Sequence, residues 1–237
     1  MTSDRPASIS SESTESSRLS SWLIANPNHD STRPREREKK SRIERFNNSL
    51  NAIVNLKDFD EIREISRVKD ESLDSDLPLN GIPFAIKDIF NVVGFPTTEG
   101  LNTNRDSLPA SNSIFVNRLQ EKGGIIIGKT NTSELAIGSH TVNKIFGPTA
   151  NPYNYSLSAG GSSGGAAAAV SMNLVPCADG SDMMGSCRNP AAFTNLYGYR
   201  PTPGVIPEQR DNSVDRKMPI ISTCLLYTSD AADDGYR

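Results

Sequence analysis

The chain has 237 residues, of which 35% are hydrophobic, and it carries a net charge of −3 with a pI near 5.5. This length suits one large or two small domains, and the acidic balance argues against a general nucleic-acid-binding protein. No apolar run reaches the roughly 18 residues of a membrane span, and the polar N-terminus lacks the apolar core of a secretory signal.

The few cysteines and histidines argue against disulfide, zinc and Ser-His-Asp sites. Cys177, Cys187 and Cys224 fit neither a disulfide framework nor zinc-ligand spacing, so we expect no metal site and a reducing, cytoplasmic environment. The two histidines are His29 and His140. A Ser-His-Asp triad would need His140, and no neighbouring motif supports one.

The N-terminal third predicts disorder followed by helices. Residues 1–20 are rich in Ser, Thr and Glu and lack an apolar stripe, which indicates disorder. A short apolar cluster around Trp22 suggests a docking helix. The basic stretch 33–54 has two interpretations, a nucleic-acid patch or the wet face of an amphipathic helix. Apolar residues recur at helical spacing from Ile43 to Ile53, which favours the helix, and residues 59–71 read as another.

Short apolar strands then alternate with helices. Residues 78–97 read as short strands broken by Gly and Pro, 113–123 as a helix, and 123–130 as a buried strand. Residues 132–139 predict a short helix opened by a Thr or Ser cap, and the Ala-rich residues 166–173 a longer one. This alternation predicts an α/β fold.

The segment GGIIIGKT, residues 123–130, matches the phosphate-binding pattern G-x-x-x-x-G-K-T. In a phosphate-binding loop these residues curl so that their N–H groups point at phosphate. Ile125–Ile127 are β-branched and favour an extended strand instead. We therefore interpret the segment as structural.

Lys87 ends the apolar run IPFAI. A solvated lysine has a pKa near ~10.4 and is a poor base, but burial disfavours its charged form and lowers the pKa. The alternative is that Lys87 simply pairs with the adjacent Asp88.

The glycine-rich segment GGSSGG, residues 160–165, could be a flexible linker. It is short, however, and runs directly into a strong helix former. A turn of this kind presents backbone N–H groups and the positive end of a helix dipole.

Three motifs in this order resemble those of the amidase signature family: GIPFAIKD with Lys87, GGSSGG with Ser162, and DGSDMMGSCRNPA with Ser186. The resemblance covers about residues 40–210. It implies an α/β fold with a mixed β-sheet covered by helices on both sides. It also implies amide hydrolysis by a Ser-Ser-Lys triad, with Ser186 as nucleophile, Ser162 as proton relay and Lys87 as base.

The resemblance assigns further roles around Ser186. The backbone N–H groups of the oxyanion hole would come from Met183, Met184, Gly185 and Ser186. Structural support would come from Gly161, which precedes a cis peptide bond, from Ser163, and from an ion pair of Asp182 with Arg188. Many family members carry glycine where Met184 stands, so we expect a narrower or more apolar pocket. Cys187 is a rival nucleophile without an accompanying base motif.

The predicted function is therefore an amidase that cleaves the carbon–nitrogen bond of a small-molecule linear amide without metal or other cofactor. Neither nucleic acid nor membrane is an expected partner, and the resemblance allows a homodimer of the full-length protein. One alternative is the glutaminase-like A subunit of a tRNA-dependent amidotransferase, although DMMGS departs from the DTGGS-type loop of those subunits. Another is a non-catalytic fragment.

The end of the chain differs from the rest. Residues 21–223 correspond to the N-terminal part of an amidase signature domain, and family members are about twice as long as this chain. Residues 224–237, CLLYTSDAADDGYR, resemble a sequencing-adapter read-through, and we expect them to be non-native. A sheet without its later strands has an unpaired edge, so we predict a poorly stable and inactive chain.

Overall fold

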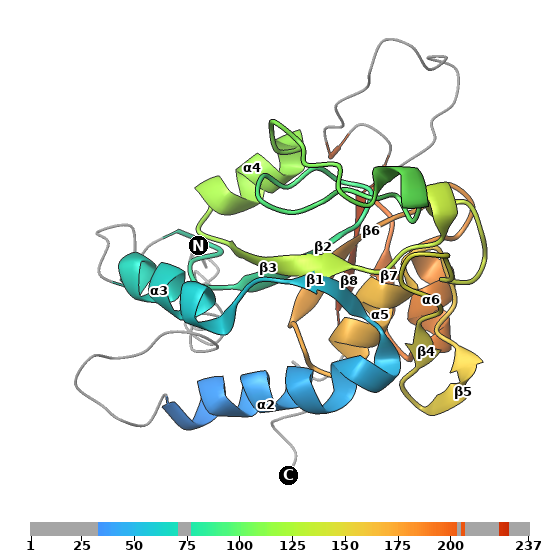
Figure 1. Cartoon of the computed structure of the whole chain (residues 1–237), viewed down its shortest axis with the longest axis horizontal. Coiled ribbons are helices and arrows are strands. Elements are labelled where there is room, and N and C mark those ends of the chain that lie inside the picture. The colour runs from blue at the N-terminus through green and yellow to red at the C-terminus, as the bar shows by residue number, and fades with distance from the viewer. Residues whose placement is uncertain (1–32, 71–76, 203–204, 207–222, 228–237) are drawn as a thin grey trace, which may run out of the picture.

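The computed structural model describes residues 33–70, 77–202, 205–206 and 223–227 (Figure 1). The predicted disordered segment 1–20 and the docking helix at Trp22 lie outside the described residues. In chain order the elements are α2 (Arg33–Leu50), β1 (Ile53–Leu56), α3 (Phe59–Asp70), β2 (Pro83–Lys87), η1 (Asn102–Asn104), α4 (Ile114–Glu121), β3 (Ile125–Thr130), η2 (Glu134–Ala136), β4 (Ala150–Asn151), β5 (Asn154–Ser158), α5 (Gly164–Ser171), β6 (Cys177–Ser181), α6 (Arg188–Phe193), β7 (Tyr197–Tyr199) and β8 (Thr223–Tyr227).

A mixed sheet lies at the centre of the molecule. Its strand order is β1-β3-β2, with β1 antiparallel and β2 parallel to β3. Every residue of β2 and β3 is buried, as expected for strands covered on both faces. Strand β6 lies beside β2 and forms a second sheet of order β6-β8-β7, and β4 and β5 form a separate hairpin.

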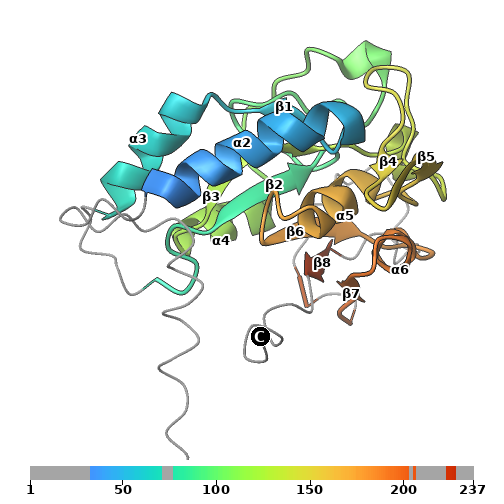
Figure 2. The ribbon, with the colours of Figure 1, turned by 90° about the horizontal axis from the view of Figure 1, so that it is seen from below.

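Two hydrophobic cores flank the central sheet, because successive side chains of β3 point to opposite faces. Ile125 and Ile127 join the larger core, which α2 and α5 cover and against which α3 packs. Ile126 joins the smaller core, together with Phe115 and Val116 of α4. Figures 1 and 2 show α4 on one side of the sheet and α2, α3 and α5 on the other. The predicted α/β class, with a mixed sheet between helices, is confirmed.

Most of the predicted elements are confirmed, with local differences. The helices at α2, α3, α4 and α5 form as expected, although Ile53 belongs to β1 rather than to the preceding helix. The strand β3 occupies residues 125–130, so the phosphate-loop interpretation is wrong. The predicted helix 132–139 is only the 3-10 turn η2, and the side chain of Ser133 makes no cap hydrogen bond. Residues 160–165 are fully buried, which excludes a flexible linker.

Strand β8 includes the first residues of the segment 224–237, and it pairs antiparallel with both β6 and β7. The remainder of that segment lies outside the described residues. The non-native origin of residues 224–237 and the domain boundaries therefore stay predictions.

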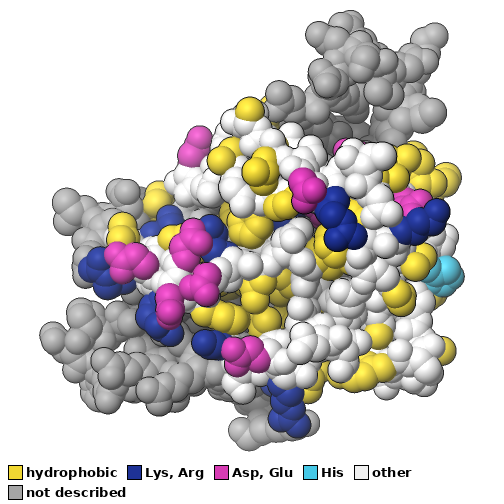
Figure 3. All heavy atoms as spheres, viewed as in Figure 1, with side chains coloured by type: hydrophobic (Ala, Val, Ile, Leu, Met, Phe, Trp, Pro, Cys, Tyr) yellow, Lys and Arg dark blue, Asp and Glu magenta, His cyan; other side chains and the backbone are white. Residues whose placement is uncertain are grey.

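The charged side chains of the outer helices are paired locally. On α3, Arg63 forms an ion pair with Asp60, and Arg67 forms one with Glu64. On α2, Lys40 forms an ion pair with Glu44. Figure 3 shows basic and acidic side chains interspersed on this face rather than separated by sign. Among the described side chains, this surface is the polar side of amphipathic helices. The side chains of residues 33–39 lie outside the described ones, so the two interpretations of the basic stretch 33–54 stay predictions. In the part of the chain that the structure describes, no helix is long and apolar enough to cross a membrane.

Candidate active site

Lys87 is the last residue of β2 and its side chain is completely buried. Its Nζ donates to three serine hydroxyls, at 2.7 Å to Oγ of Ser162, 2.9 Å to Oγ of Ser163 and 2.7 Å to Oγ of Ser181. The end of β2, the turn before α5 and the end of β6 thus meet at one amine. Three of the predicted site residues therefore lie together, because Lys87 contacts both Ser162 and Ser163.

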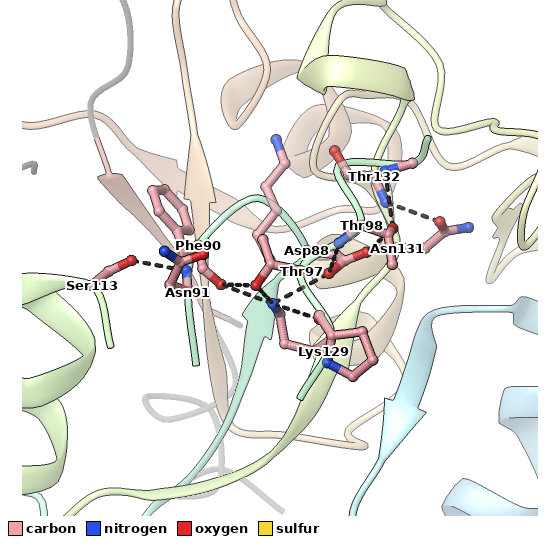
Figure 4. A network of polar contacts seen from close by, with 12 residues as sticks. Asp88, Phe90, Asn91, Thr97, Thr98, Ser113, Lys129, Asn131 and Thr132 are labelled. Atoms are coloured by element: carbon pink, nitrogen blue, oxygen red, sulfur yellow. Dashed lines mark hydrogen bonds and ion pairs between the residues drawn. The ribbon is translucent and has the colours of Figure 1, made fainter. Parts of the chain in front are cut away.

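Asp88 does not pair with Lys87, contrary to the alternative considered from the sequence. Its Oδ1 lies 3.2 Å from Nζ of Lys129 on β3, and both side chains are completely buried. Lys129 also donates to the carbonyl of Phe90 at 2.8 Å and to Oγ1 of Thr97 at 3.1 Å, and Figure 4 shows these groups around it. Burial raises the pKa of Asp88 and lowers that of Lys129, while each partner's charge opposes the shift. Asp88 therefore forms a buried ion pair with Lys129.

The turn that presents Ser162 is tightly built. The Gly161–Ser162 peptide bond is cis, and a Cβ on Gly161 would lie 2.6 Å from the carbonyl carbon of His140. Only glycine fits so close an approach. Oγ1 of Thr141 donates to the carbonyl of Ser162 at 3.2 Å and accepts from N–H of Gly164 at 2.8 Å. These contacts fix the hydroxyl of Ser162 at the N-terminus of α5.

The loop between β6 and α6 carries Ser186, whose side chain is partly exposed. Its carbonyl accepts from N–H of Ser163 at 3.0 Å, which places this loop against the serine turn. Asp182 organises the loop: its carboxylate accepts from N–H of Gly185 at 2.7 Å and forms two hydrogen bonds with the Arg188 guanidinium, both at 2.9 Å. Burial acts to raise the pKa of Asp182, but Arg188 and the backbone N–H groups outweigh it and lower that pKa to about 2.

The remaining residues of this loop differ in their accessibility. N–H of Gly185, one of the expected oxyanion donors, already donates to the carboxylate of Asp182 at 2.7 Å. Met184 is 81% exposed and Met183 is half-buried. Cys187 is completely buried, which does not suit a nucleophile.

The remaining histidine, cysteine and carboxylate side chains do not form another catalytic or metal site among the described residues. His140 pairs through Nδ1 with Oγ of Ser158 at 2.9 Å, so it is not placed as the base of Ser162 or Ser186. Burial raises the pKa of the Cys177 thiol to about 12, and the nearby Asp179 adds to this effect. Among the described residues, no group of three or more His, Cys, Asp or Glu side chains could hold a metal ion.

Sequence reasoning missed two residues of the site. The hydroxyl oxygen of Ser181 accepts a hydrogen bond from the Lys87 amine, and the carboxylate of Asp179 accepts the backbone N–H of Lys87 at 3.0 Å. Both lie on β6, directly before the motif that contains Ser186. No pattern along the chain pointed to them, because they meet Lys87 only where β6 lies beside β2.

Comparison with known proteins places this arrangement in a family. The model of the Amidase family matches residues 37–224. The acylamidase of Rhodococcus erythropolis is 45% identical over 171 residues, which are 70% of this chain and 35% of the relative. The A subunit of the glutamyl-tRNA(Gln) amidotransferase of Acidothermus cellulolyticus is 42% identical over 152 residues, which are 62% of this chain and 30% of the relative.

Solved structures agree with these sequence matches. A bacterial aryl acylamidase of the amidase signature enzymes superimposes with a TM-score of 0.74 at 32% identity, over 81% of this chain and 40% of that one. The 6-aminohexanoate cyclic dimer hydrolase, in complex with its substrate, gives 0.72 at 29% identity, over 82% of this chain and 40% of that one. The chain spans about a third of the length of these curated relatives. It belongs to the amidase signature family.

Proposed function

We propose that the protein to which this chain belongs is an amidase that hydrolyses a small-molecule carboxylic amide through a serine acyl-enzyme. The observation that carries the proposal is the buried amine of Lys87, 2.7 Å from the hydroxyl of Ser162. A buried lysine that contacts neutral hydroxyls is suited to act as a general base. The acylamidase and hydrolase relatives support this reaction class.

In the proposed first step a proton passes from Oγ of Ser186 to Oγ of Ser162, and from Ser162 to the neutral amine of Lys87. Oγ of Ser186 forms a bond with the amide carbonyl carbon. The proton then returns through Ser162 to the leaving nitrogen, the carbon–nitrogen bond breaks, and ammonia or an amine departs. Water attacks the resulting ester by the same proton route and releases the acid.

The oxyanion of the tetrahedral intermediate needs backbone donors beside the nucleophile. Because N–H of Gly185 is taken by Asp182, the proposed donors are the N–H groups of Met183, Met184 and Ser186. The Asp182–Arg188 ion pair would hold these donors in place. The exposed Met184 would contact the substrate and favour an apolar substituent.

Labelling of the full-length protein with a fluorophosphonate probe tests the proposal. We expect covalent labelling at Ser186, located by peptide mass spectrometry, and its loss in Ser186→Ala and Lys87→Ala. Lys57→Ala, at a surface ion pair with Glu61, is the matched control and should label normally. Labelling that persists in Lys87→Ala would exclude the proposed base.

A second candidate is the glutaminase-like A subunit of a tRNA-dependent amidotransferase. It is favoured by the glutamyl-tRNA(Gln) amidotransferase of Methanosarcina barkeri, whose A subunit is 46% identical over 129 residues. The methionine pair 183–184, in place of the Thr-Gly expected in those subunits, favours the stand-alone amidase. Hydrolysis of an acyl anilide but not of glutamine would support the amidase, and the reverse preference would support the amidotransferase. A cytoplasmic location and a homodimer of the full-length protein stay predictions.

A further inference from the structure

A buried carboxylate lies behind the Lys87 amine. Asp179, on β6, is only 2% exposed. Its Oδ1 accepts the backbone N–H of Lys87 at 3.0 Å. Its Oδ2 has no hydrogen-bond partner among the residues that the structure describes. Burying a carboxylate oxygen without a hydrogen-bond partner costs free energy of folding. Such a group in a native structure points to a functional role of Asp179 rather than to packing alone.

The charged groups around Asp179 come from three strands. Lys87 lies on β2 and Lys129 on β3, and both cations act on Asp179 electrostatically. Cys177 faces it from its own strand. Lys129 already has a direct ion-pair partner in Asp88, at 3.2 Å. The side chain of Lys87 contacts the hydroxyls of three serines, and its charge acts on the buried Asp179.

We propose that Asp179 is a positioning residue for Lys87: one carboxylate oxygen fixes the backbone of Lys87, and the negative charge sets the proton affinity of its amine. The inference rests on the proposed function. When the amine takes the proton of Ser162, the O–H bond breaks, an N–H bond forms, and the new positive charge lies near Asp179. An ionised Asp179 stabilises that ammonium without touching the substrate.

The carboxyl group of Asp179 is expected to lose its proton near neutral pH. Burial raises its pKa to about 7, against the opposing effects of the Lys87 N–H and of the charges on Lys87 and Lys129. Two coupled groups of opposite charge titrate as a pair. A cationic Lys87 therefore lowers the pKa of Asp179, and an ionised Asp179 in turn stabilises the ammonium form of Lys87.

The first experiment follows the carboxyl carbon of Asp179 by ¹³C NMR between acidic and alkaline pH, in the whole 237-residue chain. We expect a midpoint near 7 in the unmodified chain. In Lys87→Met and in Lys87→Gln it should rise by about 1 unit or more, because the neighbouring cation is lost. Lys57→Met is the control and should leave the midpoint unchanged. Equal midpoints in all four proteins would overturn the coupling.

This titration needs neither enzyme activity nor an Asp179 variant. It therefore tests the electrostatic coupling between Asp179 and Lys87 even if the proposed nucleophile is wrong. The second experiment measures the rate of fluorophosphonate labelling at Ser186 against pH in the full-length protein. In Asp179→Asn the midpoint of the rise should move to lower pH by about 1 unit, and the plateau rate should fall about tenfold, because the amine is a weaker base. The exposed Asp106→Asn is the matched control.

A purely structural role predicts a lower rate in Asp179→Asn with an unmoved midpoint, and that result would refute the positioning role. If the folded full-length protein is not labelled at all, the proposed function fails, and the NMR titration alone tests the contact of Asp179 with Lys87.

Discussion

The proposed base of this site is held by serine hydroxyls rather than by a carboxylate side chain. Lys87 contacts Ser162, Ser163 and Ser181, and Oγ of Ser163 also accepts N–H of Ser181 at 3.2 Å. Three hydroxyls around one amine fix its orientation: as an ammonium it donates to all three, and as a neutral amine it donates to two and accepts from Ser162. The proton path therefore depends on Ser163 and Ser181, which orient the amine without relaying the proton.

Removing one of these acceptors should slow the reaction without unfolding the chain. We predict that Ser181→Ala lowers the rate of fluorophosphonate labelling about tenfold to a hundredfold, the range expected for a hydrogen bond to a charged group. The exposed Ser156→Ala on β5 is the control and should label at the normal rate. Unchanged labelling of Ser181→Ala, measured by mass spectrometry over time, would show that the contact does not orient the amine.

At the scale of the elements, β2 and β3 are joined by a buried ion pair as well as by their hydrogen-bonded ladder. Lys129 on β3 reaches Asp88, which directly follows β2. We predict that Lys129→Met lowers the free energy of unfolding by about 3–5 kcal/mol, because Asp88 is left charged and buried. Urea denaturation measures this.

The matched comparison is Arg63→Met, which breaks an exposed pair with Asp60 and should cost about 1 kcal/mol or less. The double variant Lys129→Met/Asp88→Asn should recover part of the loss, since it removes the unpaired charge. Equal effects of Lys129→Met and Arg63→Met would contradict the buried pair.

The same elements show which structural features can be predicted from the sequence and which cannot. Three consecutive isoleucines predict strand β3 correctly, because β-branching is a local property. The partner of Asp88 is not local: it depends on the register that sets Ile86 opposite Lys129, which no pattern along the chain specifies. Ser181 and Asp179 were missed for the same reason, since they meet Lys87 only when β6 lies beside β2.

For the whole molecule, the Asp182 carboxylate should govern stability in acid. Its pKa is lowered to about 2 from an ordinary value of 3.8. A lowered pKa means that the native state favours the ionised form, so its contribution is present above pH 4 and is lost as the pH falls from 4 to 2. We predict that the free energy of unfolding falls over this range, and falls less in Asp182→Asn.

Urea denaturation at successive pH values measures the difference between the two proteins, which should shrink toward pH 2. Asp106→Asn, at an exposed position, should follow the unmodified chain. A difference that stays constant from pH 4 to 2 would show that Asp182 does not act through its charge.

One end of the molecule exposes large apolar side chains. Figures 1 and 2 place β5, α6 and β7 together at this end. The exposed residues include Tyr155 and Leu157 of β5, at 48% and 58%, and Phe193 of α6, at 50%. Among the described strands, β5 pairs only with the short β4, so it also has an unpaired edge. Exposed apolar patches and open strand edges both promote association.

We therefore predict that the 237-residue chain self-associates, and that Tyr155→Ser/Leu157→Ser shifts it toward monomer, as measured by sedimentation velocity over a range of concentrations. The control is Val93→Ser/Leu108→Ser, which removes two apolar residues that are somewhat more exposed, at 53% and 67%, but lie outside β5, α6 and β7. If both double variants shift the equilibrium equally, association follows total apolar exposure and not this edge. If neither does, the end formed by β5, α6 and β7 is not the surface through which the chains associate.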